Sequence, residues 1–168
     1  MNAKTAAKLS IPMQMREDCS IKKSMDIIGD RWSVLILREM FLGTNRFADF
    51  QRNLGIAKNI LSARLQKLEE HRIIEKRPIN AETSWNEYLP TEAGEDLLTV
   101  LCALIQWGDR WLQDDKAPPM LVVDRQSRKP IDGLMVTRKK RPLKREDIRF
   151  WPSARYKTFE QQEAEQYL

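Results

Sequence analysis

The stretch Ala57–Ile74, which reads AKNILSARLQKLEEHRII, limits most narrowly how this chain can fold. At the spacing of an α-helix, its apolar residues share one face: Ile60, Leu61, Leu65 and Leu68. The other side of the same helix carries hydrogen-bond donors: Lys58, Asn59, Ser62, Arg64, Gln66 and Lys67. We therefore expect an amphipathic helix that packs its leucines against a core and leaves a polar surface in solvent.

The segments around this helix are expected to form a series of helices followed by a hairpin. The expected elements are a helix from Asp18 or Ser20 to about Ile28, a helix over Arg31–Leu42 capped by Asp30, a short helix capped by Asn45, the helix over Ala57–Glu70, strands over Ile73–Ile79 and Trp85–Leu89, and a helix from Thr91 to about Leu112. Glycines that suit chain turns follow the first three helices: Gly29, Gly43 and Gly55. This order predicts a winged helix-turn-helix, a mainly α fold with a small β wing.

The last long helix is apolar over more of its surface than one core requires. Its apolar residues are Leu97, Leu98, Val100, Leu101, Cys102, Leu104, Ile105, Trp107, Trp111 and Leu112. A helix that packs on one side needs an apolar stripe of ~100°. The surplus indicates either a fully buried helix or an interface between two copies of the chain, and we expect the second. The expected dimer interface consists of Leu97, Leu101, Leu104, Ile105, Trp107 and Trp111.

Composition divides the chain into four parts. They are a flexible N-terminal arm (1–18), a winged helix-turn-helix and dimerisation domain (19–116), a small β extension (117–151) and a polar C-terminal tail (152–168). The extension is predicted because the apolar stretches Leu121–Val123 and Leu134–Val136 alternate with polar turns after Pro118.

A helix-turn-helix reads DNA through the first turns of its second helix, while neighbouring elements hold phosphates. The residues expected to contact base edges are Lys58, Asn59, Ser62, Ala63 and Arg64. The residues expected to contact the DNA backbone are Arg46, Gln66, Lys67, Lys76 and Arg77. In a major groove the side chain of Asn59 suits adenine, and that of Arg64 or Lys58 suits guanine. The alternative is a helix face that is only solvated.

The composition is that of a globular protein without recognisable catalytic machinery. The 168 residues are 42% hydrophobic and 32% charged. The sequence holds no apolar run long enough for a bilayer and no signal-peptide core, and its two cysteines fit a reducing cytoplasm. Phosphate-binding glycine loops, His-based nucleophile pairs and metal-ligand clusters are not recognisable, so we expect no enzyme activity, no cofactor and no metal.

Cys19 and two tryptophans are candidate sites for a regulatory signal. Cys19 stands just before a helix N-terminus, with Lys22 and Lys23 one turn further on. The helix dipole and the ammonium groups favour the thiolate, which makes Cys19 a candidate redox sensor; a small packing residue is the alternative. Trp107 and Trp111 could line an effector pocket between subunits, with core packing as the alternative.

Several motifs resemble those of the HxlR-type winged helix-turn-helix regulators. The matching residues are CSIKKSMDIIGDRWSVLILREM at Cys19–Met40, Arg46-Phe47 with Phe50, Gly55-Ile56, Leu61–Leu65 with Leu68-Glu69, and Tyr88, Thr91 and Gly94. The resemblance covers about residues 19–112. It implies a homodimeric bacterial transcription regulator with dimer contacts from its first and last helices.

The chain departs from this family pattern at a few positions. His71-Arg72 stands where such proteins usually have a glycine after the recognition helix, and Pro90 stands where many have leucine. Residues 113–150 are similar in outline to the β extension of some members. They contain no Cys and no His, which excludes the usual zinc ligands there.

The sequence thus predicts a sequence-specific repressor that binds double-stranded DNA. It is expected to act as a cytoplasmic homodimer on a pseudo-palindromic operator, away from membranes, under the control of a redox signal or a small-molecule effector. The alternative for the same fold is a winged-helix interaction module without sequence-specific DNA binding.

Overall fold

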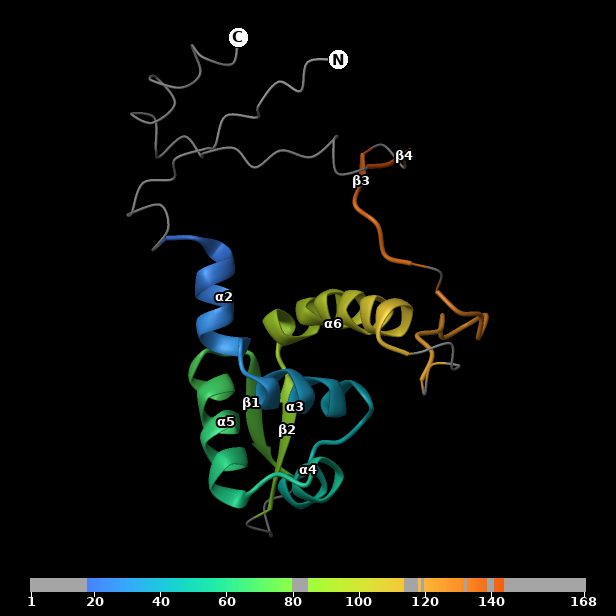
Figure 1. Cartoon of the computed structure of the whole chain (residues 1–168). Coiled ribbons are helices and arrows are strands. Elements are labelled where there is room, and N and C mark those ends of the chain that lie inside the picture. Colours follow the sequence, from blue (N-terminus) through green and yellow to red (C-terminus); the bar gives the residue numbers. More distant parts are fainter. Residues whose placement is uncertain are drawn as a thin grey trace, which may run out of the picture. The chain divides into compact units, whose positions relative to one another are not determined.

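The structure is a computed structural model that describes residues 18–79, 85–113, 118, 120–131, 133–138 and 141–143 (Figure 1). Its elements are α2 (Ser20–Ile28), α3 (Arg31–Phe41), α4 (Phe47–Leu54), α5 (Lys58–Glu70), β1 (Ile74–Pro78), β2 (Asn86–Pro90), α6 (Glu92–Trp111), β3 (Thr137–Arg138) and β4 (Arg141–Pro142). The chain forms two compact units, Lys23–Leu134 and Met1–Lys22 with Met135–Leu168. The expected arm, apart from Asp18, and the expected tail lie outside the described residues.

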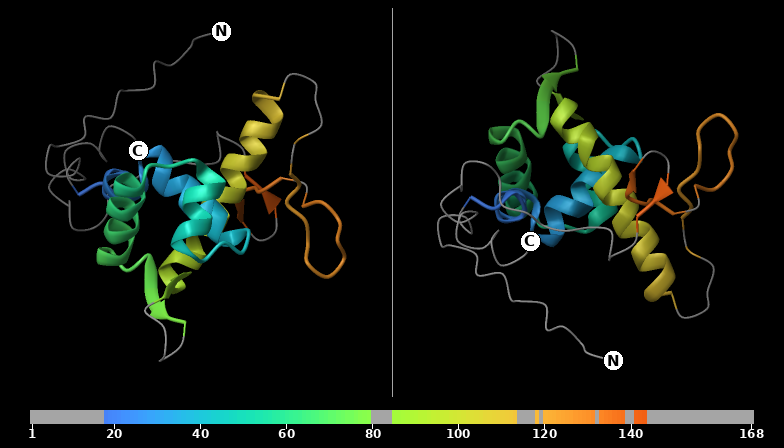
Figure 2. Two further views of the ribbon diagram at one scale, coloured as in Figure 1. Left: turned by 90° about the horizontal axis from the view of Figure 1, so that it is seen from below. Right: turned by 90° about the horizontal axis from the view of Figure 1, so that it is seen from above.

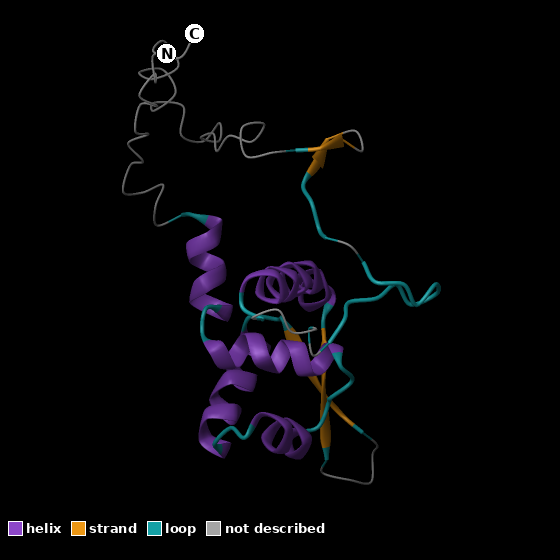
Figure 3. Ribbon diagram, turned by 45° about the vertical axis from the view of Figure 1, so that its right-hand side comes forward, coloured by secondary structure: helices purple, strands orange, loops and turns teal. Residues whose placement is uncertain are grey.

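Helix α3 is the central element of the unit Lys23–Leu134. It contacts α4, α5, α6 and β2, and it lies between α6 and α4 in Figure 1 and among the other helices in Figure 3. Ile36 and Leu37 of α3 are 0% and 1% exposed. The other apolar core residues are Ile28, Met40, Phe50, Ile56, Leu61, Leu65, Leu68, Ile74 and Leu101. The helices and the wing therefore share one core, whose burial drives their packing.

Helix α3 begins and ends next to the capping residue and the glycine that the sequence predicts for it. The Asp30 carboxylate accepts hydrogen bonds from the backbone N–H groups of Trp32 and Ser33, both at 3.0 Å, and so caps the helix. At the other end Gly43 has a φ of +93°, a left-handed conformation that glycine adopts without strain. The N–H of Gly43 bonds to the Met40 carbonyl, which helps to close the last turn.

The predicted cap of the next helix is wrong. Helix α4 begins at Phe47 after Arg46, so Asn45 stands one position too early to cap it. The Asn45 side-chain amide donates instead to Oε2 of Glu87 at 3.0 Å, and the backbone carbonyl of Asn45 accepts the N–H of Tyr88 at 2.8 Å. Both partners lie in β2, so Asn45 attaches the wing to the chain before α4.

Strands β1 and β2 form the predicted wing as a two-stranded antiparallel sheet. The register runs from Ile74 opposite Pro90 to Pro78 opposite Asn86. Pro78, which cannot donate a ladder hydrogen bond, occupies the terminal pair. The two views of Figure 2 show the wing projecting beyond the helices.

The connection from α5 to β1 closes in a Schellman motif without glycine. The N–H of Arg72 bonds to the Glu69 carbonyl and the N–H of Ile73 to the Leu68 carbonyl, both at 2.9 Å. Arg72 occupies the left-handed position of this motif with a φ of +55°. The missing glycine at His71-Arg72 therefore leaves the path into the wing intact, with an arginine in a conformation that costs free energy.

Helix α6 is capped as predicted and ends within one residue of the predicted position. The hydroxyl of Thr91 accepts the N–H of Gly94 at 3.2 Å, and the helix runs to Trp111. Within the described part of the chain, no helix combines the length and the apolar character that crossing a membrane requires.

The predicted β extension forms only in part among the described residues. Leu121–Val123 is not a strand: Val123 makes a single bridge with Pro130, which has no N–H with which to extend a ladder. Leu134–Val136 is not a strand either, and β3 starts only at Thr137. The backbone N–H of Leu134 donates to the side chain of Gln106 in α6, as described below.

Candidate nucleic-acid interface

Helices α4 and α5 form the helix-turn-helix pair. Gly55 follows α4 with a φ of +60°, the side chain of Ile56 enters the core, and Ala57 is extended before α5 begins. Three leucines of α5 are at most 1% exposed: Leu61, Leu65 and Leu68. They determine which side of α5 faces the core and which side faces solvent.

The polar residues of α5 form an exposed surface opposite this buried stripe. Asn59, Ala63 and Gln66 follow one another at intervals of four and three residues, and they share one face of the helix. Lys58 and Ser62 are exposed beside them. We call these five residues the α5 outer face. It contains four of the five residues predicted to contact bases: Lys58, Asn59, Ser62 and Ala63.

Arg64, the fifth of them, points elsewhere. It follows Leu61 by three residues and precedes Leu68 by four, so it borders the buried stripe. Its Nε lies 3.1 Å from Oδ1 of Asp30, and its side chain is 33% exposed. A contact between Arg64 and a base stays a prediction, and it would require the side chain to leave Asp30.

Gln66 also lies in the α5 outer face, and its predicted contact with the DNA backbone stays a prediction. Its spacing from Asn59 and Ala63 was the signal for this position. Its Nε2 donates to Oε1 of Glu70 at 2.8 Å. Glu69 and Glu70 are exposed on the last turn, where carboxylates would repel phosphates, so the first turns of α5 are the part suited to DNA.

The residues predicted to contact the DNA backbone, which are four cations and the neutral amide of Gln66, are largely accessible. Arg46, Gln66, Lys76 and Arg77 are exposed, and Lys67 is half-buried. Arg46 lies at the start of α4 with its guanidinium carbon 6.0 Å from the centre of the Trp85 ring. Arg77 on β1 forms an ion pair with Glu75, which reduces the positive charge that the wing presents.

Asn45 and Phe50 hold the wing next to the helix-turn-helix. Asn45 bonds to Glu87 and Tyr88 as described above, and the rings of Phe50 and Tyr88 meet edge to face with centroids 6.5 Å apart. The positive residues of β1 therefore belong to a wing that is attached to α4. Sequence patterns did not indicate this contact, because its partners are far apart in the chain.

A buried carboxylate joins α3 to the start of the helix-turn-helix. Glu39 is 6% exposed and accepts hydrogen bonds from Arg38 at 2.8 Å, Asn53 at 3.0 Å and Thr44 at 3.3 Å. Burial raises the pKa of Glu39, but these hydrogen bonds and the charge of Arg38 outweigh burial and hold the pKa below its ordinary value. No periodic pattern along the chain indicates this network.

The predicted regulatory and dimer residues occupy different environments. Cys19 is exposed immediately before α2, and Cys102 is half-buried in α6. Leu101 is 7% exposed in the chain's own core, and Leu97 packs against that core. The exposed apolar residues of α6 are Leu98, Val100, Leu104, Trp107 and Trp111. Two of the six predicted dimer residues are thus already engaged within the chain.

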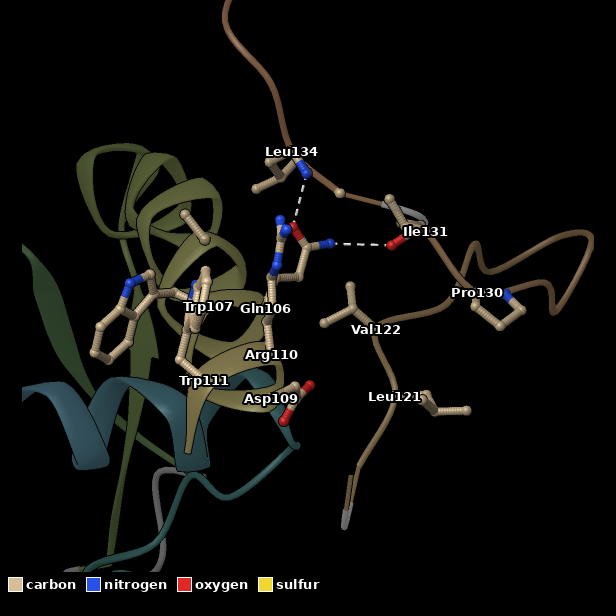
Figure 4. Close-up of a pocket in the computed structure, with 12 residues that line it drawn as sticks. Gln106, Trp107, Asp109, Arg110, Trp111, Leu121, Val122, Pro130, Ile131 and Leu134 are labelled. Carbon is tan, nitrogen blue, oxygen red and sulfur yellow. Dashed lines mark hydrogen bonds between the residues drawn. The ribbon is translucent and has the colours of Figure 1, made fainter. Parts of the chain in front are cut away.

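A cavity of about 560 Å³ lies between the last turns of α6 and the segment after it (Figure 4). Gln106 joins its two sides: Nε2 donates to the Ile131 carbonyl at 3.0 Å, and Oε1 accepts the N–H of Leu134 at 2.7 Å. Trp107 and Trp111 contribute to its lining, so the predicted pocket residues do border a cavity within one chain. Across the described ranges, no three His, Cys, Asp or Glu side chains gather as a metal ion would require.

A sequence comparison identifies relatives of the helical core. An uncharacterized HTH-type transcriptional regulator of Mycobacterium tuberculosis, Rv3095, is 41% identical over 101 residues. This match covers 60% of the present chain and 64% of the relative, so it spans less than two thirds of the relative's length.

Two solved structures have the same fold. PA1607, described as a candidate transcription factor, is 36% identical with a TM-score of 0.76, and the match covers 84% of this chain and all of that one. PA1374 of Pseudomonas aeruginosa, described in the same way, is 32% identical with a TM-score of 0.59, and covers 85% and 99%. The model of the HxlR-like helix-turn-helix family matches residues 27–116. The chain, with its winged helix-turn-helix, therefore belongs to the HxlR-like helix-turn-helix family.

Proposed function

We propose that this chain is a DNA-binding transcriptional regulator, a repressor that inserts α5 into the major groove of its operator. The observation that carries this proposal is the α5 outer face, which stays accessible while three leucines of the same helix are buried in the core. Related proteins are described as transcriptional regulators or transcription factors, which supports the proposal. We place its action in the cytoplasm.

Sequence preference would come from the first turns of α5. The Asn59 amide can pair with adenine, the Lys58 ammonium with guanine, and the Ala63 methyl group can contact thymine. Ser62 can donate to or accept from a base edge. Affinity independent of sequence would come from phosphate contacts by Arg46, Gln66, Lys67, Lys76 and Arg77.

We further propose that the regulator is a homodimer. The surface that supports this is the exposed apolar part of α6, in which Leu104, Trp107 and Trp111 are 50%, 57% and 64% exposed. Exposed apolar surface of this extent favours a partner. Two copies related by a twofold axis would offer two α5 helices to half-sites about 34 Å apart on a pseudo-palindromic operator.

We also propose that a signal controls DNA binding. Cys19 is exposed, which an oxidant sensor requires, and its reactivity toward an alkylating agent would test this role. A thiol that reacts no faster than the cysteine of an unstructured peptide would remove the redox hypothesis. A small-molecule effector remains the other proposed signal.

A gel-shift experiment with the DNA upstream of the protein's own gene tests the proposed function. We expect binding that prefers this fragment over random duplex at two salt concentrations, because base contacts survive when phosphate contacts are screened. Asn59→Ala should weaken specific binding by about 1–3 kcal/mol. Gln126→Ala, which truncates an exposed amide outside the helix-turn-helix, is the matched control.

Binding that disappears with salt and shows no preference would contradict a sequence-specific regulator. That outcome would favour a winged-helix interaction module instead.

A further inference from the structure

We propose that Arg64 is a positioning residue: its ion pair with Asp30 holds α5 at a defined orientation on α3, and Arg64 does not itself read a base. This inference rests on the proposed DNA-binding function and deepens it. It concerns the accuracy with which the α5 outer face is presented to DNA.

Asp30 is a fixed anchor because it is already bound by α3. Its Oδ1 accepts the N–H groups of Trp32 and Ser33, and its Oδ2 accepts the Ser33 hydroxyl at 2.6 Å. Ser33 is 0% exposed. Moving the carboxylate would uncap α3 and leave a buried hydroxyl without this partner, so Arg64 meets a carboxylate that cannot easily follow it.

Arg64 is the partner in this ion pair that lies on α5, the proposed recognition helix. Its Nε approaches Asp30 Oδ1 to 3.1 Å, and the two side chains are 33% and 27% exposed. Water and salt screen a partly buried ion pair less than they screen an exposed one. Burial raises the pKa of Asp30, but hydrogen bonds from Ser33, the charge of Arg64 and the Trp32 N–H outweigh burial and lower it. The carboxylate is therefore charged at neutral pH.

The pair supplies a second point of attachment for α5. At its C-terminal end, the Thr91 hydroxyl lies 2.6 Å from the Arg72 carbonyl and holds the exit of the helix. The Asp30–Arg64 pair lies a turn or more earlier and restrains rotation of α5 about its own axis. Side chains on a helix fixed in this way approach bases without reorganisation, which favours both affinity and selectivity.

Positioning and base reading by Arg64 make opposite predictions for Asp30. A base-reading Arg64 would be released by Asp30→Asn and would bind at least as well, since asparagine retains the helix cap. A positioning Arg64 needs the carboxylate, so Asp30→Asn and Arg64→Gln should have equal effects. The double variant should then bind DNA no more weakly than either single variant, because both substitutions remove the same interaction.

The test uses a duplex selected by the full-length wild-type protein from a randomised pool, and all its single-base variants. We expect Arg64→Gln and Asp30→Asn each to lower affinity about five- to tenfold across all of these duplexes. Arg64→Lys, which keeps the charge, should restore part of the loss. Asn59→Ala serves as the comparison, because its loss should depend on one base pair.

A loss with Arg64→Gln that is confined to one base pair, together with full binding by Asp30→Asn, would overturn the proposal and assign base reading to Arg64. Equal binding by wild type and both variants would also overturn it, while an effect of Asn59→Ala would leave the proposed function intact.

Amide hydrogen exchange of the free protein separates this inference from the proposed function. If wild type selects no sequence at all, the proposed function fails, yet the ion pair can still be tested. We expect Asp30→Asn and Arg64→Gln to raise exchange in α5 equally and without further increase in the double variant. Unchanged exchange in both variants would overturn the proposal, whatever the DNA measurements give.

Discussion

The hydroxyl group of Thr91 lies 2.6 Å from the carbonyl oxygen of Arg72 and 3.1 Å from that of Ile73. The same oxygen accepts the N–H of Gly94, so one side chain caps α6 and holds the end of the recognition helix. The helix that carries the proposed dimer surface thus begins against the connection from α5 to β1, just after the helix that carries the proposed DNA surface. Changes at this junction should affect both.

Replacing Thr91 by valine should destabilise the chain. The variant keeps the shape of the side chain but loses the cap and the donor to the Arg72 carbonyl, at a cost of about 1–2 kcal/mol. Urea denaturation measures the free energy of unfolding. Thr91→Ser, which keeps the hydroxyl, is the control, and equal losses in the two variants would argue against the hydrogen bonds as the cause.

Two glycines in the same helix should respond in opposite ways to alanine. A Cβ on Gly94 would lie 2.2 Å from the Ile73 carbonyl oxygen, whereas a Cβ on Gly108 meets nothing within 4 Å. Gly94→Ala should therefore cost about 1–3 kcal/mol through overpacking. Gly108→Ala should stabilise the helix by about 0.5–1 kcal/mol. Thermal unfolding of both variants checks the pair, and a tolerated Gly94→Ala would mean that α6 can move away from Ile73 in the connection between α5 and β1.

Arg72→Gly should stabilise the folded chain. Arg72 adopts a φ of +55°, which costs a non-glycine residue roughly 1–2 kcal/mol. Glycine avoids this cost, but it loses more conformational entropy on folding, which offsets part of the gain. We expect a net gain of about 0.5 kcal/mol in the free energy of unfolding. Arg72→Val, with a branched side chain, should be destabilising. A loss with glycine would indicate that the Arg72 side chain makes a stabilising contact.

Stability should fall in acid through Asp30 and Glu39. The pKa of each is lower in the folded chain than its ordinary values of 3.8 and 4.5, respectively. Each carboxylate therefore contributes fully at pH values above these, and its contribution is lost as the pH falls through the folded pKa. Urea denaturation from neutral pH to below 3.8 measures this. Asp30→Asn should weaken the dependence of the free energy of unfolding on pH. If this dependence is the same in the variant as in wild type, Asp30 does not contribute to it.

Leu104→Glu should separate the proposed homodimer. A carboxylate in the exposed apolar part of α6 would be buried without a partner in the dimer, whereas it is solvated in a monomer. Sedimentation at micromolar concentration should show a dimer for wild type and a monomer for the variant. Trp85→Ala removes an exposed apolar side chain outside α6, next to the wing, and should stay dimeric. A monomeric wild type would contradict the homodimer.

The elements that residue patterns predict correctly are those whose causes are local. Asp30 and Thr91 cap the helices that were expected to start there, and Gly43 and Gly55 end the helices that were expected to stop. The leucines of α5 are buried at the spacing that predicted them. These features depend on residues within about one helical turn of each other, so periodicity and capping chemistry suffice to predict them.

Which polar groups meet across the chain depends on how the helices and strands pack together. Asn45 lies 42 residues from its partner Glu87, so a predicted cap became a contact with the wing. Arg64 turned from the expected DNA surface to Asp30 because it borders the stripe that packs on the core. Leu101 is buried in the chain's own core. The Gln106 side chain accepts a hydrogen bond from the backbone N–H of Leu134, in a stretch that was expected to be part of the β extension. Such pairs depend on how helices are placed in space, which residue spacing along one helix does not contain.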